Sequence, residues 1–406
     1  MANEQHARSE RTSRILGSVR VATGDHPVTQ FELFFDLVFV FAFTQVTQTI
    51  SHDHSMIDVL QAMIILGLLW WSWVAYAWLG NQAFADRGTM PLSLAGAASL
   101  MFVVGFAIPQ AFAEEGGPRP EPFVLVAAYV GVRIVNVALY LVAARDDICL
   151  KRQLLLTSAI AVAPMTVLLV IGAVLGGPAQ AWFWLAALLY DAAAVFFTSR
   201  RGDFRVTSPA HAAERFGLVV ILALGESTIS TGVGLRDVPV DALSIAAVFL
   251  VVAGNFIIWW TYFHRFSPAV HAALAALTGR FRLDAATHVY TFGHFPIVAG
   301  IILTAAGIES TIAHIGDTEP LGLFGALSIG AGGSVVLATT AAIWYRMTKR
   351  ILLVRLIVAA LFLPASILAA QLLPIVFLVV FVAGGAVVVV VEARTKVLHT
   401  AADLPT

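Results

Sequence analysis

Apolar stretches of about 20 residues recur along almost the whole chain, beginning at Phe31. A helix of this length crosses a hydrocarbon core of about 30 Å, so each stretch predicts one membrane-spanning helix. The runs lack the alternation of a transmembrane barrel, and an open sheet leaves backbone groups unpaired in lipid. The predicted fold class is therefore all-α, a polytopic membrane protein. We expect twelve spans, at about 31–50, 57–79, 90–112, 122–144, 153–175, 180–198, 212–234, 240–263, 287–308, 321–344, 351–371 and 374–392.

The composition fits lipid rather than water. Charged residues make up 12% of the 406 residues, about half the roughly 25% typical of soluble domains, and apolar residues reach 59%. The mean hydropathy is +0.87. A formal net charge of −1 excludes the basic footprint of a nucleic-acid-binding protein. The single cysteine, Cys149, excludes an intramolecular disulfide, a thiolate-built zinc site and an iron–sulfur cluster.

Lysine and arginine residues are concentrated in every second connection between the predicted spans, which are the connections on one side of the membrane. With twelve spans and both termini on one side, that side collects 21 of the 24 basic residues, and the opposite connections keep only Arg119 and Arg236. Because cytoplasmic loops collect Lys and Arg, both termini are expected in the cytoplasm. We expect a cytoplasmic polar N-terminal segment at 1–28, six-helix repeats at 29–200 and 201–395, and a cytoplasmic tail at 396–406. The first segment lacks the features of a signal peptide.

The predicted repeats rest on correspondences between the two halves of the chain. Six spans return the chain to the same side of the membrane, so such repeats are parallel. Each match is weak alone, because tryptophan pairs and Lys-Arg pairs favour membrane interfaces and cytoplasmic loops for unrelated reasons. The matches, in the same order in both halves, are His26, Phe31 and Leu33 with His211, Phe216 and Leu218; Trp70-Trp71 with Trp259-Trp260; and Lys151-Arg152 and Pro164 with Lys349-Arg350 and Pro364.

Carboxylates in the first and seventh spans are the leading candidates for a function. An ionisable side chain inside a span costs about 2.5–3.5 kcal/mol, so it requires a partner, water or a role. In FELFFDLVFVFAFTQ, Glu32 and Asp36 are four residues apart and share a helix face. In LGESTIS, Glu226 is expected deep in the bilayer, followed by Ser227. Glu32 can instead complement a helix amino end, and Glu226 can be a hydrogen-bonded structural group.

The fourth span contains an arginine near its middle, Arg133, with Asn136 one turn away. An arginine does not lose its proton and needs a carboxylate when buried. Asp36, Glu226 and Asp191 of the sixth span are the available partners, and we expect Asp36 first and Glu226 second. A purely structural ion pair is an equal alternative.

The ninth span, HVYTFGHFPIVAG, predicts a broken or kinked helix, because Gly293 and Pro296 flank His294. Such irregular backbone is one way in which transporters build sites. No zinc motif accompanies the histidines, so we expect no metal site and no cofactor. The glycines at 330, 332 and 333 lack the context of a phosphate-binding loop and are interpreted as helix packing.

Three motifs resemble the bacterial low temperature requirement A family: FELFFDLVFVFAFTQ at 31–45, RFGLVVILALGESTI at 215–229 and FGHFPIVAGIILTAAG at 292–307. The resemblance covers residues 26–395 and implies an integral inner-membrane protein. FFDLVFVFAFT is also similar to the first-helix FSDA-type motif of the endolysosomal potassium channel family, which has two six-helix repeats. Phe35 and Asp36 would match its Phe and Asp, but the serine is missing, and the matching places of the seventh span hold Val220 and Ile221.

We therefore expect a transporter or channel for a small solute, proton or cation. The alternatives are a membrane-embedded enzyme that acts on lipid, with His294 or His288 near a carboxylate, and a structural or sensory scaffold. Expected partners are membrane lipids and an unidentified solute or ion, but no nucleic acid, and a homo-oligomer is left open. The expected pathway residues are Glu32, Asp36, Arg133, Asn136, Asp191, Glu226, Ser227 and His294.

Overall fold

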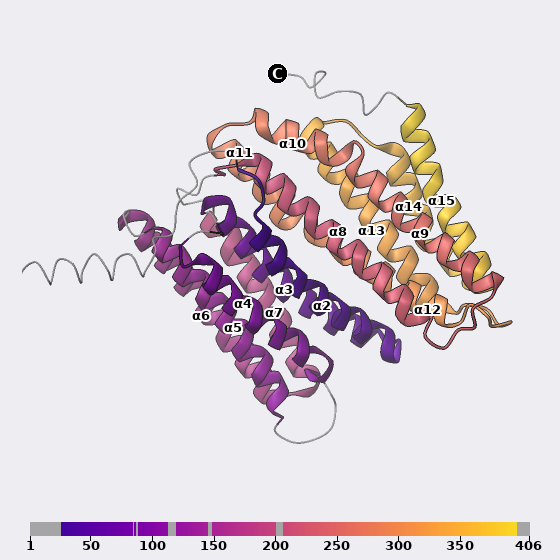
Figure 1. Cartoon of the computed structure of the whole chain (residues 1–406), viewed down its shortest axis with the longest axis horizontal. Helices are drawn as coiled ribbons and strands as arrows, with labels where there is room; N and C mark the ends of the chain where they lie inside the picture. The colour runs from indigo at the N-terminus through magenta and orange to yellow at the C-terminus, as the bar shows by residue number, and fades with distance from the viewer. Residues whose placement is uncertain are drawn as a thin grey trace, which may run out of the picture. The chain divides into compact units, whose positions relative to one another are not determined.

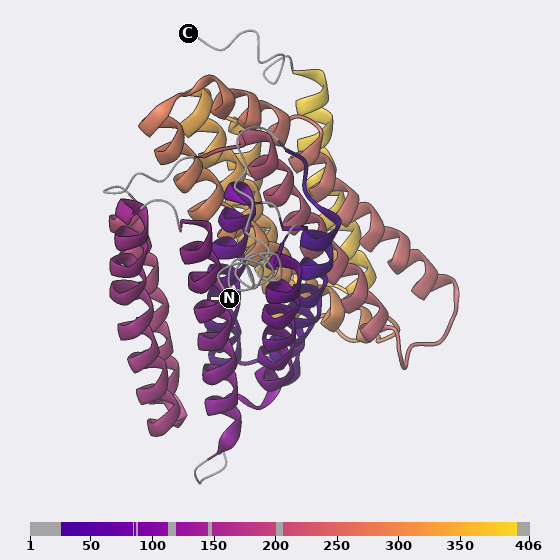
Figure 2. The ribbon, with the colours of Figure 1, turned by 60° about the vertical axis from the view of Figure 1, so that its left-hand side comes forward.

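The computed structural model describes residues 26–83, 85–86, 88–112, 119–144, 148–199 and 206–395, and these residues form helices and connections without a β-strand. Most of the predicted N-terminal segment and the predicted tail 396–406 lie outside the described residues. Each predicted span corresponds to one long helix (Figures 1 and 2). These helices are α2 (Gln30–Asp53), α3 (Met56–Gln82), α4 (Met90–Ala107), α5 (Pro120–Ala143), α6 (Ile148–Leu175), α7 (Gly177–Ser199), α8 (Pro209–Gly234), α9 (Ala242–Phe263), α12 (His294–Ala313), α13 (Leu323–Thr348), α14 (Leu353–Ala369) and α15 (Pro374–Arg394).

Eleven helices among the described residues are long and apolar enough to cross a membrane, and α14 is a shorter apolar helix. With 17 residues, α14 is at the lower limit of about 17–25 residues for a spanning helix. Many large apolar side chains point outward, including Ile134, Trp182 and Phe249 at 58%, 63% and 71% exposure. In water such a surface would promote association, but in lipid it matches the solvent. The predicted class, a polytopic helical membrane protein, is confirmed.

The connection after α9 differs from the expected loop. It contains two short helices, α10 (Phe266–Ala276) and α11 (Gly279–Ala286). Arg282 stabilises the end of α10, because its Nε donates to the carbonyl oxygen of Leu277 at 2.6 Å and its Nη2 to that of Ala275 at 3.1 Å. A basic side chain at a helix carboxyl end satisfies carbonyls that lack helical partners. The sequence analysis only counted this arginine among the 21 basic residues of the cytoplasmic side.

The chain divides into two compact units. Unit 1 comprises residues up to Ala42 and Gly67–Ala212, and unit 2 comprises Phe43–Leu66 and the residues from Ala213 onward. Both units therefore take part of α2, part of α3 and part of α8. This division follows packing rather than sequence similarity, so the predicted duplication stays a prediction.

In unit 1, successive helices pack as neighbours, α4 on α5, α5 on α6 and α6 on α7. The α6–α7 hairpin turns at Gly176 and Gly177, whose φ angles are +64° and +53°. Glycine adopts this left-handed conformation without the steric penalty of a side chain. Gly105 provides a second close approach, because a Cβ there would lie 2.9 Å from the Phe41 ring of α2.

In unit 2, α13 packs between α12 and α14, and α15 packs on α9 and α14. Glycines form the α12–α13 seam: a Cβ on Gly300 would lie 2.7 Å from the carbonyl oxygen of Gly332, and one on Gly307 would lie 2.9 Å from that of Gly325. On the other side of α13, a Cβ on Gly333 would lie 3.0–3.2 Å from phenylalanines of α14 and α15. Small residues let helices approach closely where lipid supplies no hydrophobic drive. The packing interpretation of the glycine cluster is confirmed.

Candidate functional site

Glu226 lies at the centre of a polar cluster in unit 2. It is fully buried on α8, where Oε2 accepts a 2.5 Å hydrogen bond from Thr44 Oγ1 and Oε1 accepts a 3.0 Å bond from Ser230 Oγ. The Thr47 hydroxyl also lies within reach of this carboxylate. Thr44 and Thr47 come from the part of α2 that belongs to unit 2. The Thr44 hydroxyl of the first predicted span thus donates to the deep carboxylate of the seventh.

A second carboxylate, Glu309 on α12, faces the same cluster. Glu309 is electrostatically coupled to Glu226, and the hydroxyls of Ser51 and Ser230 lie beside it. Its Oε2 is buried and has no hydrogen-bond partner among the described residues. Arg236, in the connection after α8, is the cation in electrostatic range. The sequence analysis missed Glu309 because the ninth span was ended at residue 308, although GIESTIA continues the apolar run on both sides of it.

Ser227, the neighbour of Glu226, makes a separate contact. Its hydroxyl donates to Asn255 Oδ1 at 3.0 Å, which joins α8 to α9. Ser227 is 1% exposed. This side chain therefore forms a bond between two helices, and it is Ser230, one turn later, that holds the carboxylate.

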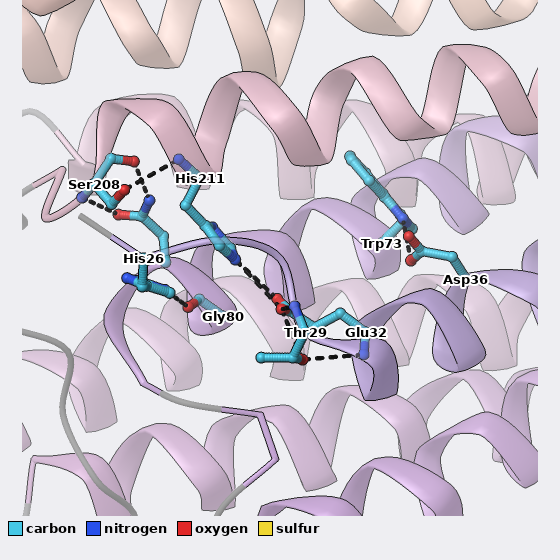
Figure 3. A network of polar contacts seen from close by, with 9 residues as sticks. His26, Thr29, Glu32, Asp36, Trp73, Gly80, Ser208 and His211 are labelled. Carbon is cyan, nitrogen blue, oxygen red and sulfur yellow. Dashed lines mark hydrogen bonds and ion pairs between the residues drawn. The ribbon is translucent and has the colours of Figure 1, made fainter.

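Glu32 is the centre of a second network, which lies in unit 1 (Figure 3). Its carboxylate accepts hydrogen bonds from the backbone amide and the hydroxyl of Thr29 at 2.9 and 3.0 Å. The Thr29 hydroxyl also lies 3.3 Å from the Glu32 amide, an arrangement equivalent to a capping box at the start of α2. This is the structural role anticipated for Glu32 at a helix amino end. The carboxylate has a further partner, however, in the first turn of α8.

That partner is His211, whose Nε2 lies 3.1 Å from Glu32 Oε1 (Figure 3). His211 is fully buried, and its Nδ1 has no hydrogen-bond partner among the described residues. The His26 ring lies 4.5 Å from the His211 ring, and His26 Nε2 donates to the carbonyl oxygen of Gly80 at 3.1 Å. A Cβ on Gly80 would overlap Glu32 Oε1, so the absence of a side chain makes room for the contact between Glu32 and His211. The two histidines matched in the duplication analysis are thus in contact.

Asn81 positions the segment that carries His211. Its Oδ1 accepts from the amides of Thr207 and Ser208 at 3.0 and 3.4 Å, and its Nδ2 donates to the Ser208 carbonyl at 2.6 Å. The Ser208 hydroxyl accepts from the His211 amide at 3.0 Å and so caps α8. One buried amide at the end of α3 thereby fixes the start of α8 within unit 1.

Asp36 does not pair with Arg133, so the first expectation for the arginine is wrong. Asp36 is 1% exposed and accepts a 3.0 Å hydrogen bond from the Trp73 indole of α3 (Figure 3). Arg133 Nη2 instead lies 3.1 Å from Asp191 Oδ1, which joins α5 to α7. The second expected partner, Glu226, belongs to the cluster in unit 2. The reason is geometric: Arg133 lies on the helix that packs beside the α6–α7 hairpin, whereas Asp36 is turned toward α3.

The Arg133–Asp191 ion pair is buried and is held by few hydrogen bonds. Both residues are buried, at 7% and 0% exposure, and a single N–O contact joins them. Arg133 Nη1 makes a long 3.5 Å contact to the Trp71 carbonyl, and Asp191 Oδ2 has no hydrogen-bond partner among the described residues. Asn136 is buried nearby on the same helix, with its Nδ2 unpartnered in this part of the structure. The charges neutralise each other, which favours the structural interpretation of Arg133.

His294 follows an irregular turn, as predicted. Residues Thr287–Phe292 form a π-helix, and α12 begins at His294. His294 Nδ1 lies 2.8 Å from the Val289 carbonyl and must donate to it, so Nε2, 2.7 Å from the Tyr262 hydroxyl, accepts in the neutral ring. Both ring nitrogens are thus engaged. His288, six residues earlier, lies 3.5 Å from the Asp284 carboxylate, which also contacts Arg346 at 3.3 Å.

A buried ion pair in α14 and α15 was also missed. Arg355 Nε and Nη2 donate to the two oxygens of Glu392 at 2.6 and 2.9 Å, and Nη2 also lies 2.8 Å from the Thr261 carbonyl. Arg355 is fully buried in the first turn of α14, inside the predicted span at 351–371, although the topology count included it among the 21 basic residues of the cytoplasmic side. The signal was available, since Glu392 is the one carboxylate of the last two predicted spans.

No three histidine, cysteine or acidic residues of the described ranges come close enough together to hold a metal ion. The interior instead offers hydroxyls, carboxylates and hydrogen-bonded histidines. These groups can exchange protons or coordinate a small cation through oxygen.

The fold and these buried networks define a polytopic α-helical membrane protein with ionisable groups in its interior. The family model described as bacterial low temperature requirement A protein (LtrA) matches residues 27–391, and the chain belongs to this family. The chain is also similar to "Uncharacterized protein RA0937" of Rhizobium meliloti (strain 1021), with 26% identity over 332 residues that cover 79% of this chain and 78% of the relative. No solved structure matches the chain.

Proposed function

We propose that this protein is a transporter or channel of the bacterial inner membrane that moves a proton or a small cation, and that Glu226 and Glu309 bind the ion. The observation that carries the proposal is the cluster in unit 2, where two carboxylates, Glu226 and Glu309, lie beside the same Ser230 hydroxyl. The same cluster includes hydroxyls of α2, so three helices of unit 2 converge on it.

The number of hydrogen-bond donors around the two carboxylates favours an ion between them. A serine hydroxyl has one proton, and Ser230 donates it to Glu226 Oε1. Glu309 Oε2 is left without a donor among the described residues. Two buried carboxylates repel one another unless a proton or cation neutralises one of them. Binding and release of that ion is the elementary step that the proposal requires.

The other expected pathway residues divide by their contacts. Glu32 and His211 form a pair that can hold and pass a proton, and Asp36 accepts a hydrogen bond from the Trp73 indole, so both carboxylates stay in the proposed pathway. Arg133 and Asp191 form an ion pair with each other. A structural scaffold would also contain buried ion pairs of this kind. A measurement of ion flux therefore decides between a transporter or channel and a scaffold.

The test is ion flux in liposomes that contain the purified protein and a trapped pH or cation indicator. We expect Glu226→Gln and Glu309→Gln each to reduce flux to near the level of protein-free liposomes, because glutamine keeps the shape but neither takes up a proton nor carries the negative charge that neutralises a cation. Glu319→Gln is the matched control, since Glu319 is exposed in the connection after α12. Parental flux in both interior variants, or no proton or cation flux in the parent, contradicts the proposal.

The proposed orientation, with both termini in the cytoplasm, has an independent test. Cys149 lies in the basic connection between the fourth and fifth predicted spans, so it belongs on the cytoplasmic side. A membrane-impermeant maleimide should label it in inside-out vesicles and spare it in intact cells. Labelling of intact, unlysed cells would reverse the orientation.

A further inference from the structure

A long apolar groove runs between α14 and α15 in unit 2. Its volume is about 680 Å³, within the range of about 300–1,000 Å³ for pockets that hold small ligands. Its walls include Ile357, Leu361 and Ala365 of α14 and Val380 and Val387 of α15. The groove touches neither Glu226 nor Glu309. It is therefore separate from the proposed ion-binding cluster.

The few polar groups on its walls are already bonded. The Ser366 hydroxyl donates to the Phe362 carbonyl at 2.8 Å, and the two oxygens of Glu392 accept from Nε and Nη2 of Arg355. The Thr395 hydroxyl donates to the Val391 carbonyl at 2.8 Å. A polar ligand would lose its hydration without gaining partners. The groove fits a hydrocarbon chain.

The two ends of the groove differ in charge. One end is lined by Ile351 and Thr395, which directly follow Arg350 and Arg394 in the chain. Lys349, Arg350 and Arg394 are all exposed, and Glu392, the one carboxylate between residues 345 and 395, is neutralised by Arg355. The other end is lined by Ala369 and Phe377, and the segment between them carries no charge. The site is thus cationic at one end and apolar along its length.

We propose that this groove binds one anionic phospholipid, with an acyl chain between α14 and α15 and the phosphate against Lys349, Arg350 and Arg394. A zwitterionic lipid offers the same chains without net negative charge, so the basic end selects the anionic headgroup. The apolar walls select a chain rather than a free anion, which would bind at the basic end alone.

The experiment is native mass spectrometry of the full-length protein in detergent, titrated with dioleoyl phosphatidylglycerol or dioleoyl phosphatidylcholine. We expect a severalfold higher occupancy of one phosphatidylglycerol. Ala365→Trp and Val387→Trp fill the groove from opposite walls and should each reduce that occupancy severalfold. Leu363→Trp and Val390→Trp are the matched controls, because both side chains are exposed on the same helices but do not line the groove.

The charge arm replaces Lys349, Arg350 and Arg394 with glutamine and should abolish the preference for phosphatidylglycerol. Lys151→Gln, an exposed lysine of unit 1, should leave the preference unchanged. Equal occupancy by the two lipids in the parent, or equal losses in groove and control variants, would show ordinary surface lipid and overturn the proposal. A stable dimer that the groove variants dissociate would assign the groove to a second copy and overturn it as well.

Discussion

Loss of Asp191 should destabilise the protein more than loss of Arg133, although each belongs to the same ion pair. Removal of one member of a buried pair typically costs about 3–5 kcal/mol, because the other charge stays buried. Here one 3.1 Å contact joins the pair, so we expect the lower end, about 3 kcal/mol. The asymmetry follows from chemistry: an isolated aspartate can take up a proton, whereas an isolated guanidinium cannot lose one.

The assay is a double-mutant cycle of Arg133→Met and Asp191→Leu, read as unfolding free energy in detergent. The double variant should lose less stability than Asp191→Leu alone, since an apolar pair replaces both charges. The matched cycle of Arg133→Met with Asp36→Asn should be additive within about 0.3–0.5 kcal/mol, because Asp36 bonds to Trp73. Additive losses in the Asp191 cycle, or strong coupling in the Asp36 cycle, would refute the assignment of the pair.

Three further predictions concern unit 2 and α4. Arg355→Met should cost near the upper end of about 3–5 kcal/mol, more than Arg133→Met in the same melts, because Arg355 makes two carboxylate contacts. Gly300→Val should destabilise the protein by about 1–3 kcal/mol, because the added side chain overpacks against α13. Gly96→Ala on α4 should instead stabilise it by about 0.5–1 kcal/mol, because a Cβ there meets nothing within 4 Å. Equal effects of the two variants in thermal melts would contradict the close α12–α13 packing. The Ser244 backbone amide donates to the exposed cap residue Asp241 and lowers its pKa. The contribution of this carboxylate to folding stability is therefore present above the unfolded-state pKa of about 4 and is lost as pH falls through the lower folded value. Asp241→Asn should remove this pH-dependent component from a series of melting temperatures, and an unchanged series would refute the prediction.

The helices could be predicted because lipid imposes one rule on every span. Each must be apolar for about 20 residues, and this rule located the twelve long helices of the described residues. The same rule explains two errors. Arg355 and Glu392 lie at the ends of apolar runs, where a charge is normally expected at the interface, and their bidentate contact depends on how α14 meets α15. The helices α10 and α11 are too short to register as spans.

The site was less predictable because partners are chosen by the orientation of helices. The sequence identifies Arg133 as a group that needs a carboxylate and offers three candidates, but only packing of α5, α6 and α7 selects Asp191. Likewise, spacing on α2 places Thr44 and Thr47 on one face without indicating that this face meets Glu226. The irregular turn before His294 was accessible from sequence, since glycine and proline mark it locally.

The π-turn at Thr287–Phe292 also determines which way the rest of α12 faces. A π-turn holds an additional residue compared with an α-helical turn, and one residue corresponds to about 100° of rotation around a helix axis. The turn is closed by the Gly293 amide, which donates to the His288 carbonyl at 2.9 Å, and by the His294 imidazole on the Val289 carbonyl. Glu309 lies fifteen residues further along the same helix, about 22 Å away. The π-turn and His294, at the opposite end of α12, therefore determine the side of the helix on which Glu309 lies and so its orientation toward Ser230.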